Sequence, residues 1–164
     1  MKSIVFETLT KSRLVVGDNA YEAMLRYRQI KRKDKEAGGI LLGGIRKDES
    51  EITVDLVTTP QPHDKRARTK FYRSMDHHRI AHTEWESSDG YRNYLGLWHT
   101  HPESNPSPSL VDFKDWSRAV LEGKYPGDSL FFIILGNRDI GCWQSIESKR
   151  SRIKPVSFSK LQRI

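Results

Sequence analysis

Cysteine is almost absent from this chain, and long apolar runs are missing altogether. The single cysteine, Cys142, cannot form an internal disulfide, and scarce cysteine suits the reducing cytoplasm. With no Cys-x-x-Cys pair, a cysteine-based zinc finger and the zinc deaminase signature are excluded. No apolar stretch is long enough for a transmembrane helix, and the polar N-terminus does not match a signal peptide. We therefore expect a cytoplasmic protein without a membrane segment.

The residues that are present suit one globular domain. The chain has 164 residues, enough to bury a proper core, and 36% hydrophobic content with four tryptophans argues against global disorder. We place the domain at residues 1–145. Residues 146–164 form a basic extension, in which residues 154–158 are a candidate edge strand.

The net charge of +7 comes largely from two local runs, residues 26–35 and the C-terminal extension. Clustered Lys and Arg are typical of a solvated helix face or a disordered end, and no nucleic-acid-binding motif accompanies them here. A basic patch can equally steer an acidic protein partner. We therefore do not expect a specific nucleic-acid-binding protein.

The hydrophobic pattern predicts an α/β protein, with a sheet flanked by helices. Strands are expected at residues 3–7, 14–16, 38–45, 52–57, 94–101, 129–135 and 140–145. Residues 38–45 are apolar throughout, as in a central strand that is covered on both faces. Residues 58–68 are expected to form an exposed loop.

Three helices are predicted, at residues 19–33, 75–85 and 109–122. Asp18 is the expected N-cap of the first helix, whose apolar stripe would be Ala20, Met24, Tyr27 and Ile30. In the third helix the apolar residues are Phe113, Trp116, Val120 and Leu121.

The strongest chemical signal lies in residues 99–112. His99, His101 and Asp112 are all metal-ligand side chains, and Ser109 lies between them. Two histidines at i and i+2 of a strand project to the same face, and the helix that starts at Ser109 can bring Asp112 to them. Two His and one carboxylate leave a zinc ion with an open fourth position, as in catalytic zinc sites.

The same residues have a simpler interpretation. Ser-x-x-Asp before an apolar run is a helix-capping signature, and a His pair on a strand can be part of an ordinary core. The whole string, taken together, favours the metal site. The cap and the metal site are compatible, since both need Ser109 and Asp112 to point at the same helix start.

The string from His99 to Asp112 resembles the JAMM motif of the MPN/JAB-domain metallopeptidases. That motif includes an upstream glutamate, which Glu36 matches in Glu-Ala-Gly-Gly-Ile-Leu-Leu-Gly. All five positions are present, so the chain resembles the catalytic members of the family. The resemblance covers residues 14–145. It implies an MPN-like fold, with a central, mostly antiparallel sheet flanked by about three helices, similar in architecture to cytidine deaminases.

Trp98 and the run His-Pro-Glu-x-x-Pro-x-Pro-Ser are similar to a bacterial subgroup found with ubiquitin-like conjugation genes. This subgroup includes the deconjugating peptidases of CBASS antiphage operons. The resemblance implies a protein substrate with a flexible C-terminal tail, joined to a lysine or to another polypeptide. In CBASS the conjugated protein would resemble a nucleotidyltransferase.

The family resemblance also implies a role for each residue. His99, His101 and Asp112 would hold one Zn²⁺, which acidifies water and polarises the scissile carbonyl. Glu36 would accept the proton as general base and return it to the departing amine, and the Ser109 hydroxyl would stabilise the oxyanion. Taken alone, Glu36 reads as a solvated charge in a run of Lys and Arg.

Other residue groups are weaker candidates. Cys142 lies in a strand-like stretch and is expected to be buried. His78 and His82 have i, i+4 spacing but lack the glutamate of the helical His-Glu-x-x-His motif, so a partly exposed helix face is expected. Phe71, Tyr72 and Arg73 either line a substrate groove or pack under a loop.

Two other functions remain open. One is a non-catalytic module that binds a ubiquitin-like tail or nucleic acid; Glu36 argues against it, because binding needs no general base. The other is a hydrolase for a small amide.

Overall fold

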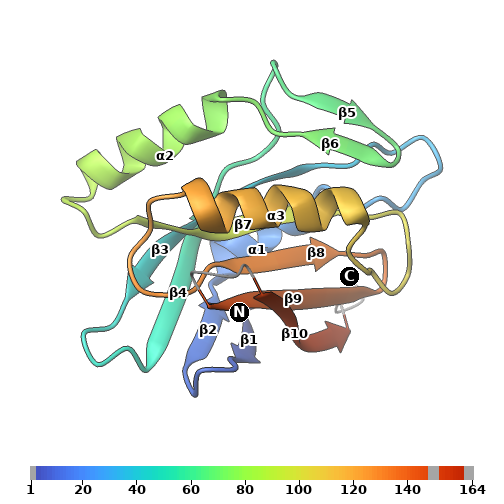
Figure 1. Cartoon of the computed structure of the whole chain (residues 1–164). Helices are drawn as coiled ribbons and strands as arrows, with labels where there is room; N and C mark the ends of the chain where they lie inside the picture. The colour runs from blue at the N-terminus through green and yellow to red at the C-terminus, as the bar shows by residue number, and fades with distance from the viewer. Residues whose placement is uncertain (1–2, 148–151, 161–164) are drawn as a thin grey trace.

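The computed structural model describes residues 3–147 and 152–160, which form an α/β protein built on one eight-stranded sheet (Figure 1). The strand order is β1-β2-β4-β3-β7-β8-β9-β10. The β2–β4 and β7–β8 pairs are parallel and the other pairs in this sheet are antiparallel, which confirms the predicted mostly antiparallel sheet. The strands are β1 Ile4–Glu7, β2 Arg13–Val16, β3 Gly38–Ile45, β4 Glu51–Val57, β7 Asn93–Thr100, β8 Phe131–Leu135, β9 Asp139–Glu147 and β10 Arg152–Lys160.

The three helices cover both faces of this sheet. Helix α1 (Asp18–Leu25) packs on one face, while α2 (Asp76–Ser87) and α3 (Leu110–Glu122) lie on the other. Neighbouring residues of β3 point to opposite faces: Leu41 joins the core under α1, and Ile40 joins the core under α3. The central strands are therefore buried on both sides, as their apolar sequences predict.

The prediction of an exposed loop at residues 58–68 is right in part: residues 58–64 contain no helix or strand, but two features differ. Thr58 is buried, and residues 65–67 form strand β5 (Lys65–Ala67), which pairs with β6 (Lys70–Tyr72) in a small separate hairpin. Thr58 tolerates burial because its hydroxyl has polar partners: it accepts from the Ile40 N–H and lies 2.6 Å from His77 Nδ1.

The first helix is much shorter than predicted and has a different N-cap. Helix α1 ends at Leu25, and Gly17, not Asp18, is the N-cap. Beyond the helix, Gln29 is buried and its side-chain amide donates to the carbonyls of Asp34 and Arg68. These long-range contacts replace the expected further helical turns and leave Ile30 exposed.

The other helices lie close to their predicted ranges, but two of the four apolar residues predicted for α3, Phe113 and Leu121, are exposed. Trp116 and Val120 are buried as predicted, whereas Leu121 is exposed because it follows Val120 by one residue, about 100° around the helix. No helix in the described residues is both long and apolar enough to span a membrane.

The C-terminal extension is described in part. Strand β10, which contains residues 154–158, pairs with β9 at one edge of the sheet. Residues 148–151 and 161–164 lie outside the described residues, and with them Lys149, Arg150 and Arg163 of the basic run.

Candidate metal centre

The register between β3 and β7 brings Glu36 to the two histidines. Gly38 lies opposite His99 in this antiparallel pair, and the Thr100 N–H donates to the Ala37 carbonyl. Continuing the register places Glu36 opposite His101. Residues opposite each other share a face of the sheet, so these three side chains point to the same side.

The start of helix α3 supplies the third candidate ligand. Ser109 is the N-cap, and its hydroxyl accepts from the Asp112 N–H while Asp112 Oδ2 accepts from the Ser109 N–H. This capping box stops the helix at Ser109 and fixes the Asp112 carboxylate at its end. Ser109 and Asp112 thus form the predicted helix cap, and this geometry is also compatible with a metal-binding role for Asp112.

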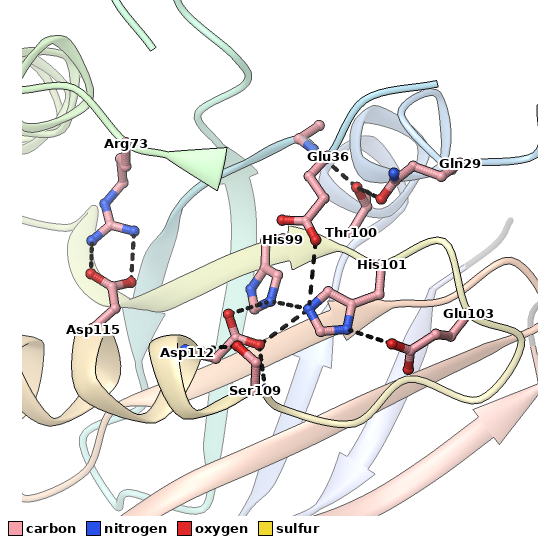
Figure 2. Close-up of polar contacts among 11 residues, drawn as sticks. Gln29, Glu36, Arg73, His99, Thr100, His101, Glu103, Ser109, Asp112 and Asp115 are labelled. Atoms are coloured by element: carbon pink, nitrogen blue, oxygen red, sulfur yellow. Dashed lines mark hydrogen bonds and ion pairs between the residues drawn. The ribbon is translucent and has the colours of Figure 1, made fainter. Parts of the chain in front are cut away.

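Three donor atoms converge at one point between β7 and α3 (Figure 2). His99 Nε2 lies 3.0 Å from His101 Nε2 and 3.2 Å from Asp112 Oδ1. Asp112 Oδ2 lies 3.1 Å from His101 Nε2. A tetrahedral zinc ion with bonds of about 2.1 Å would separate its ligand atoms by about 3.4 Å, close to this spacing.

Hydrogen bonds satisfy this group of atoms poorly. The two Nε2 atoms face each other, so in neutral imidazoles one of them must carry a hydrogen and the other must accept it. Both also face the same carboxylate. A cation would satisfy both ring lone pairs and the carboxylate charge at once, and the donor set is chemically suited to zinc.

Glu36 lies beside these ligands without being one of them. Its Oε1 is 4.0 Å from His101 Nε2, and the side chain is only 8% exposed. Burial raises the pKa of Glu36 to about 7; the positive His101 opposes this rise, and the negative Asp112 and Glu103 add to it. A carboxyl group with such a pKa can both accept and release a proton near neutral pH.

The ligands themselves show the opposite balance. Burial would raise the pKa of Asp112, but hydrogen bonds from His101 and His99 outweigh it and hold that pKa far below its ordinary value. Burial would likewise lower the pKa of His101, but the hydrogen bond to Asp112 and the negative charges around it raise that pKa. The site therefore favours an ionised carboxylate facing positive charge.

Several residues that hold the site together were missed in the sequence analysis. The Thr100 hydroxyl donates to Gln29 and accepts from the Ala37 N–H. These two hydrogen bonds connect the loop that follows α1 to the segment that carries Glu36. On the other side, the Glu36 N–H donates to the Ala67 carbonyl, and Arg66 Nε donates to the Glu36 carbonyl. Gln29 and Arg66 lie far from the motif in sequence, so no local spacing identifies them.

Glu103 is a further neighbour of the ligands. Among the described residues, His101 Nδ1 is buried without a hydrogen-bond partner, and Glu103 Oε1 is 3.9 Å away. Metal-binding histidines usually donate their second ring N–H to a carboxylate, a backbone carbonyl or water. Glu103 lies two residues after His101 in the sequence, so its position next to this ligand could have been predicted.

The other candidate residues, Phe71, Tyr72, Arg73 and Cys142, lie outside the group of proposed metal ligands. Phe71 packs on Gly38, where a Cβ would lie 2.7 Å from its ring, and Tyr72 is exposed. Arg73 pairs with Asp115 at 3.2 Å, one turn of α3 from Asp112, and lines a cavity of about 370 Å³ between α2 and α3. Cys142 is fully buried, and burial raises the pKa of its thiol, as its predicted core role requires.

The second histidine group belongs to α2. His78 and His82 are exposed, whereas His77 is fully buried. His77 Nδ1 lies 2.6 Å from the Thr58 hydroxyl and its Nε2 lies 2.7 Å from Asp64 Oδ2. Asp64 also accepts the backbone N–H groups of Gln61 and Ser74. This buried cluster of His77, Asp64 and Thr58 was not anticipated.

Comparison with known proteins points in the same direction as the geometry. The family model described as prokaryotic homologs of the JAB domain matches residues 19–148. Relatives named CD-NTase/cGAS isopeptidase include one from Pseudomonas aeruginosa, 40% identical over 114 residues, which cover 69% of this chain and 71% of the relative. Another, from Escherichia coli, is 30% identical over 160 residues, which cover 97% of this chain and 99% of the relative.

A Vibrio cholerae relative of the same name is 31% identical over 160 residues, which cover 97% of this chain and 96% of the relative. The solution structure of a Desulfitobacterium hafniense protein superposes with a TM-score of 0.58 at 17% identity. That match covers 85% of this chain and 87% of the other, and it shows a shared fold.

Proposed function

The chain belongs to the family of prokaryotic homologs of the JAB domain, and from this premise we propose that it is a zinc-dependent isopeptidase. We propose as its substrate a protein whose flexible C-terminal tail is joined to a lysine or to another polypeptide. The name shared by its relatives supports a CD-NTase, a nucleotidyltransferase, as the protein that is conjugated. The enzyme would then reverse a ubiquitin-like conjugation in the cytoplasm, as part of CBASS-type antiphage defence.

One observation supports catalysis above all: a buried carboxyl group stands next to the donor set but outside it. His99, His101 and Asp112 supply three donors, which leaves a zinc ion room for water and substrate. Glu36 is 4.0 Å from the nearest donor atom, so it is free to handle a proton. A site that only bound a tail, or only held a structural ion, would have no use for this group.

The residues then have the following roles. His99, His101 and Asp112 would hold the zinc ion, which would supply an acidified water and an electrophile for the carbonyl oxygen. Glu36 would take a proton from the attacking water and pass it to the departing nitrogen as the C–N bond breaks. The water oxygen ends on the carbonyl carbon, so the products are a free tail carboxylate and a free amine.

Ser109 would act on the carbonyl oxygen. Its oxygen already accepts the Asp112 N–H, which leaves the hydroxyl hydrogen able to donate outward. Ser109 is exposed at the helix start, where a substrate can reach it. A donor at this position stabilises negative charge that develops on the oxygen during attack.

The test uses a CD-NTase joined through its C-terminal carboxyl to a lysine side chain of a fluorescent peptide. We expect Glu36→Gln to bind about one zinc per chain, as the wild-type protein does, and to lose about 10²–10⁴-fold in turnover. A chelator should stop wild-type cleavage, and zinc should restore it. Glu86→Gln, the same change at an exposed position of α2, serves as the matched control and should retain activity.

Two results would contradict the proposal. Normal turnover by Glu36→Gln would remove the assigned proton-transfer role. A wild-type protein that holds zinc and binds the conjugate, yet releases no peptide, would favour the non-catalytic binding module.

A further inference from the structure

Two basic segments that are distant in sequence form one surface. Residues 31–35 carry four cations and residues 65–70 carry another four. The Gln29 side chain donates to the Arg68 carbonyl, and Arg68 Nη1 donates to the Arg32 carbonyl at 2.6 Å. These contacts hold the loop before β3 against the β5–β6 hairpin. We call this the basic surface, formed by Lys31, Arg32, Lys33, Lys35, Lys65, Arg66, Arg68 and Lys70.

The charges on this surface are not compensated within the protein. Seven of the eight side chains are exposed, and none of the eight forms an ion pair among the described residues. Arg66 and Arg68 bond to backbone carbonyls, which leaves their charge in place. In the two segments 31–36 and 65–70 the carboxylates are Asp34, which accepts the Lys31 N–H, and the buried Glu36.

Several arginines elsewhere in the described residues do form ion pairs with carboxylates. Arg73 pairs with Asp115 at 3.2 Å, Arg92 pairs with Glu84 at 2.9 Å, and Arg13 pairs with Glu51 at 3.7 Å. Like charges that gather without acidic neighbours repel one another and oppose folding. A surface that keeps eight of them suits a negatively charged partner from outside the chain.

The basic surface meets the metal centre at Glu36. The Glu36 N–H donates to the Ala67 carbonyl at 2.8 Å, and Arg66 Nε donates to the Glu36 carbonyl at 2.7 Å. Figure 2 shows Gln29, whose side chain holds this surface together, on the opposite side of the two histidines from Arg73 and Asp115. The surface therefore borders one particular side of the site.

The chemistry identifies which part of a substrate occupies that side. A group that protonates the departing nitrogen must come within about 3 Å of it. The polypeptide that carries this nitrogen must therefore pass close to Glu36, which borders the basic surface. Resting on the proposed function, we propose that the basic surface binds an acidic segment of the leaving polypeptide, next to the lysine that is released. The enzyme would thus select conjugates by the charge around the modified lysine.

A polypeptide fits this position better than a nucleic acid does. The occupant must be present while Glu36 transfers a proton to an amide nitrogen, and only the conjugated protein carries that nitrogen. Acidic side chains complement the surface at a range of about 8–10 Å at moderate salt, so they need no fixed register with it.

The experiment compares conjugates that differ only in the leaving peptide. A CD-NTase tail is joined to the lysine of a peptide flanked by glutamates or, in the reference, by serines. At low salt we expect kcat/KM to be about tenfold higher for the acidic peptide, which is the lower end of the rate gain from electrostatic steering. This preference should disappear at about 0.5 M NaCl, because salt screens the attraction between exposed charges.

Matched variants locate the effect. Reversing three charges on the surface with Lys31→Glu, Arg32→Glu and Lys33→Glu should abolish the preference while the serine peptide is still cleaved at the wild-type rate. The control reverses Lys11→Glu, Arg46→Glu and Lys47→Glu, with the same change in net charge. Arg46 and Lys47 follow the far end of β3, about 27 Å from its start, and this control should keep the preference. Equal cleavage of both peptides by the wild-type protein would overturn the proposal.

A binding measurement separates this inference from the proposed function. Fluorescence anisotropy of the free glutamate peptide should show binding to the wild-type and control proteins, and loss of binding in the Lys31, Arg32 and Lys33 variant, even if no conjugate is cleaved. Absent cleavage with surface-specific peptide binding would refute the peptidase and keep the basic surface. A DNA duplex that displaces the peptide and binds more tightly through the same three residues would overturn the assignment to a polypeptide.

Discussion

Two buried clusters of histidine and carboxylate lie in the described residues, and in one of them three donor atoms are arranged as metal ligands. Each lies at the start of a helix that covers the same face of the sheet. His77 is the second residue of α2, and Asp112 is the third residue of α3. In both clusters a histidine nitrogen and a carboxylate oxygen are about 3 Å apart: 2.7 Å for His77 and Asp64, and 3.1 Å for His101 and Asp112.

In the His77 cluster every hydrogen has one donor and one acceptor. The Ile40 N–H donates to the Thr58 oxygen, the Thr58 hydroxyl donates to His77 Nδ1, and His77 Nε2–H donates to Asp64. A neutral imidazole with one N–H satisfies this arrangement completely. Burial accordingly lowers the pKa of His77, although the adjacent Asp64 opposes that shift.

In the group formed by His99, His101 and Asp112, the same kinds of atom cannot be matched so simply as hydrogen-bond donors and acceptors. Two ring nitrogens face each other at 3.0 Å and both face Asp112, while His101 Nδ1 has no hydrogen-bond partner in the part of the chain that the structure describes. The negative groups around His101 raise its pKa in spite of burial, so this site draws in positive charge. The difference shows that a histidine–carboxylate contact alone does not indicate function. What matters is whether protons suffice to satisfy the donor and acceptor atoms.

The largest effect is therefore expected when one of the proposed zinc ligands is removed. His99→Ala should reduce zinc, measured by elemental analysis of the purified protein, from about one ion per chain to near zero. Cleavage of the conjugate should fall by about 10³-fold or more, because the electrophile and the acidified water are worth several kcal/mol. His82→Ala, on the exposed face of α2, is the control. A full zinc complement in His99→Ala would refute the ligand set.

How far the sequence predicts this site depends on the range of each signal. The ligands were found because strand alternation relates His99 to His101 and a capping box relates Ser109 to Asp112, and both rules act within a few residues. Glu36 is different: its place opposite His101 depends on the β3–β7 register. Only the family resemblance identified it, since the surrounding Lys and Arg favour a solvated charge.

The fold shows the same limit. Buried strands such as residues 38–45 were predicted because an apolar run is a local signal. The predicted first helix is too long, and Gln29, which was expected inside it, instead donates to the Arg68 carbonyl 39 residues away. The His77 cluster was missed because Thr58, Asp64 and His77 are each typical of an exposed loop or helix, and only long-range partners allow their burial.

The next effect concerns the other cluster and should appear in stability instead of metal content. His77→Ala leaves the buried Asp64 carboxylate without its histidine partner, and loss of one member of a buried pair costs about 3 kcal/mol. We expect the free energy of unfolding in urea to fall by that amount while the folded protein still binds about one zinc. Zinc loss at full stability would mean that His77 belongs functionally to the metal centre. His82→Ala should change stability by less than about 0.5 kcal/mol.

The smallest expected effect is the pH dependence that the His77 cluster adds to stability. Burial holds the pKa of His77 below its ordinary 6.5, helped by Arg73 and opposed by Asp64 and Asp76. The unfolded chain therefore binds more protons than the folded chain as the pH drops below about 6.5, so stability falls.

Asp64 continues this trend at lower pH. Burial would raise its pKa, but hydrogen bonds from Gln61, His77 and Ser74 hold it below the ordinary 3.8, so its contribution is lost as the pH falls further below that value. One proton changes stability by at most about 1.4 kcal/mol per pH unit. His77→Gln removes the imidazole, and urea unfolding of the chelator-treated proteins should show a shallower loss of stability between pH 7 and 5 than in the wild type. Because both proteins retain the His99, His101 and Asp112 group, its titration cancels in the comparison. Identical pH profiles would mean that His77 takes up a proton as readily in the folded protein as in the unfolded chain, and the proton order of this cluster would then be wrong.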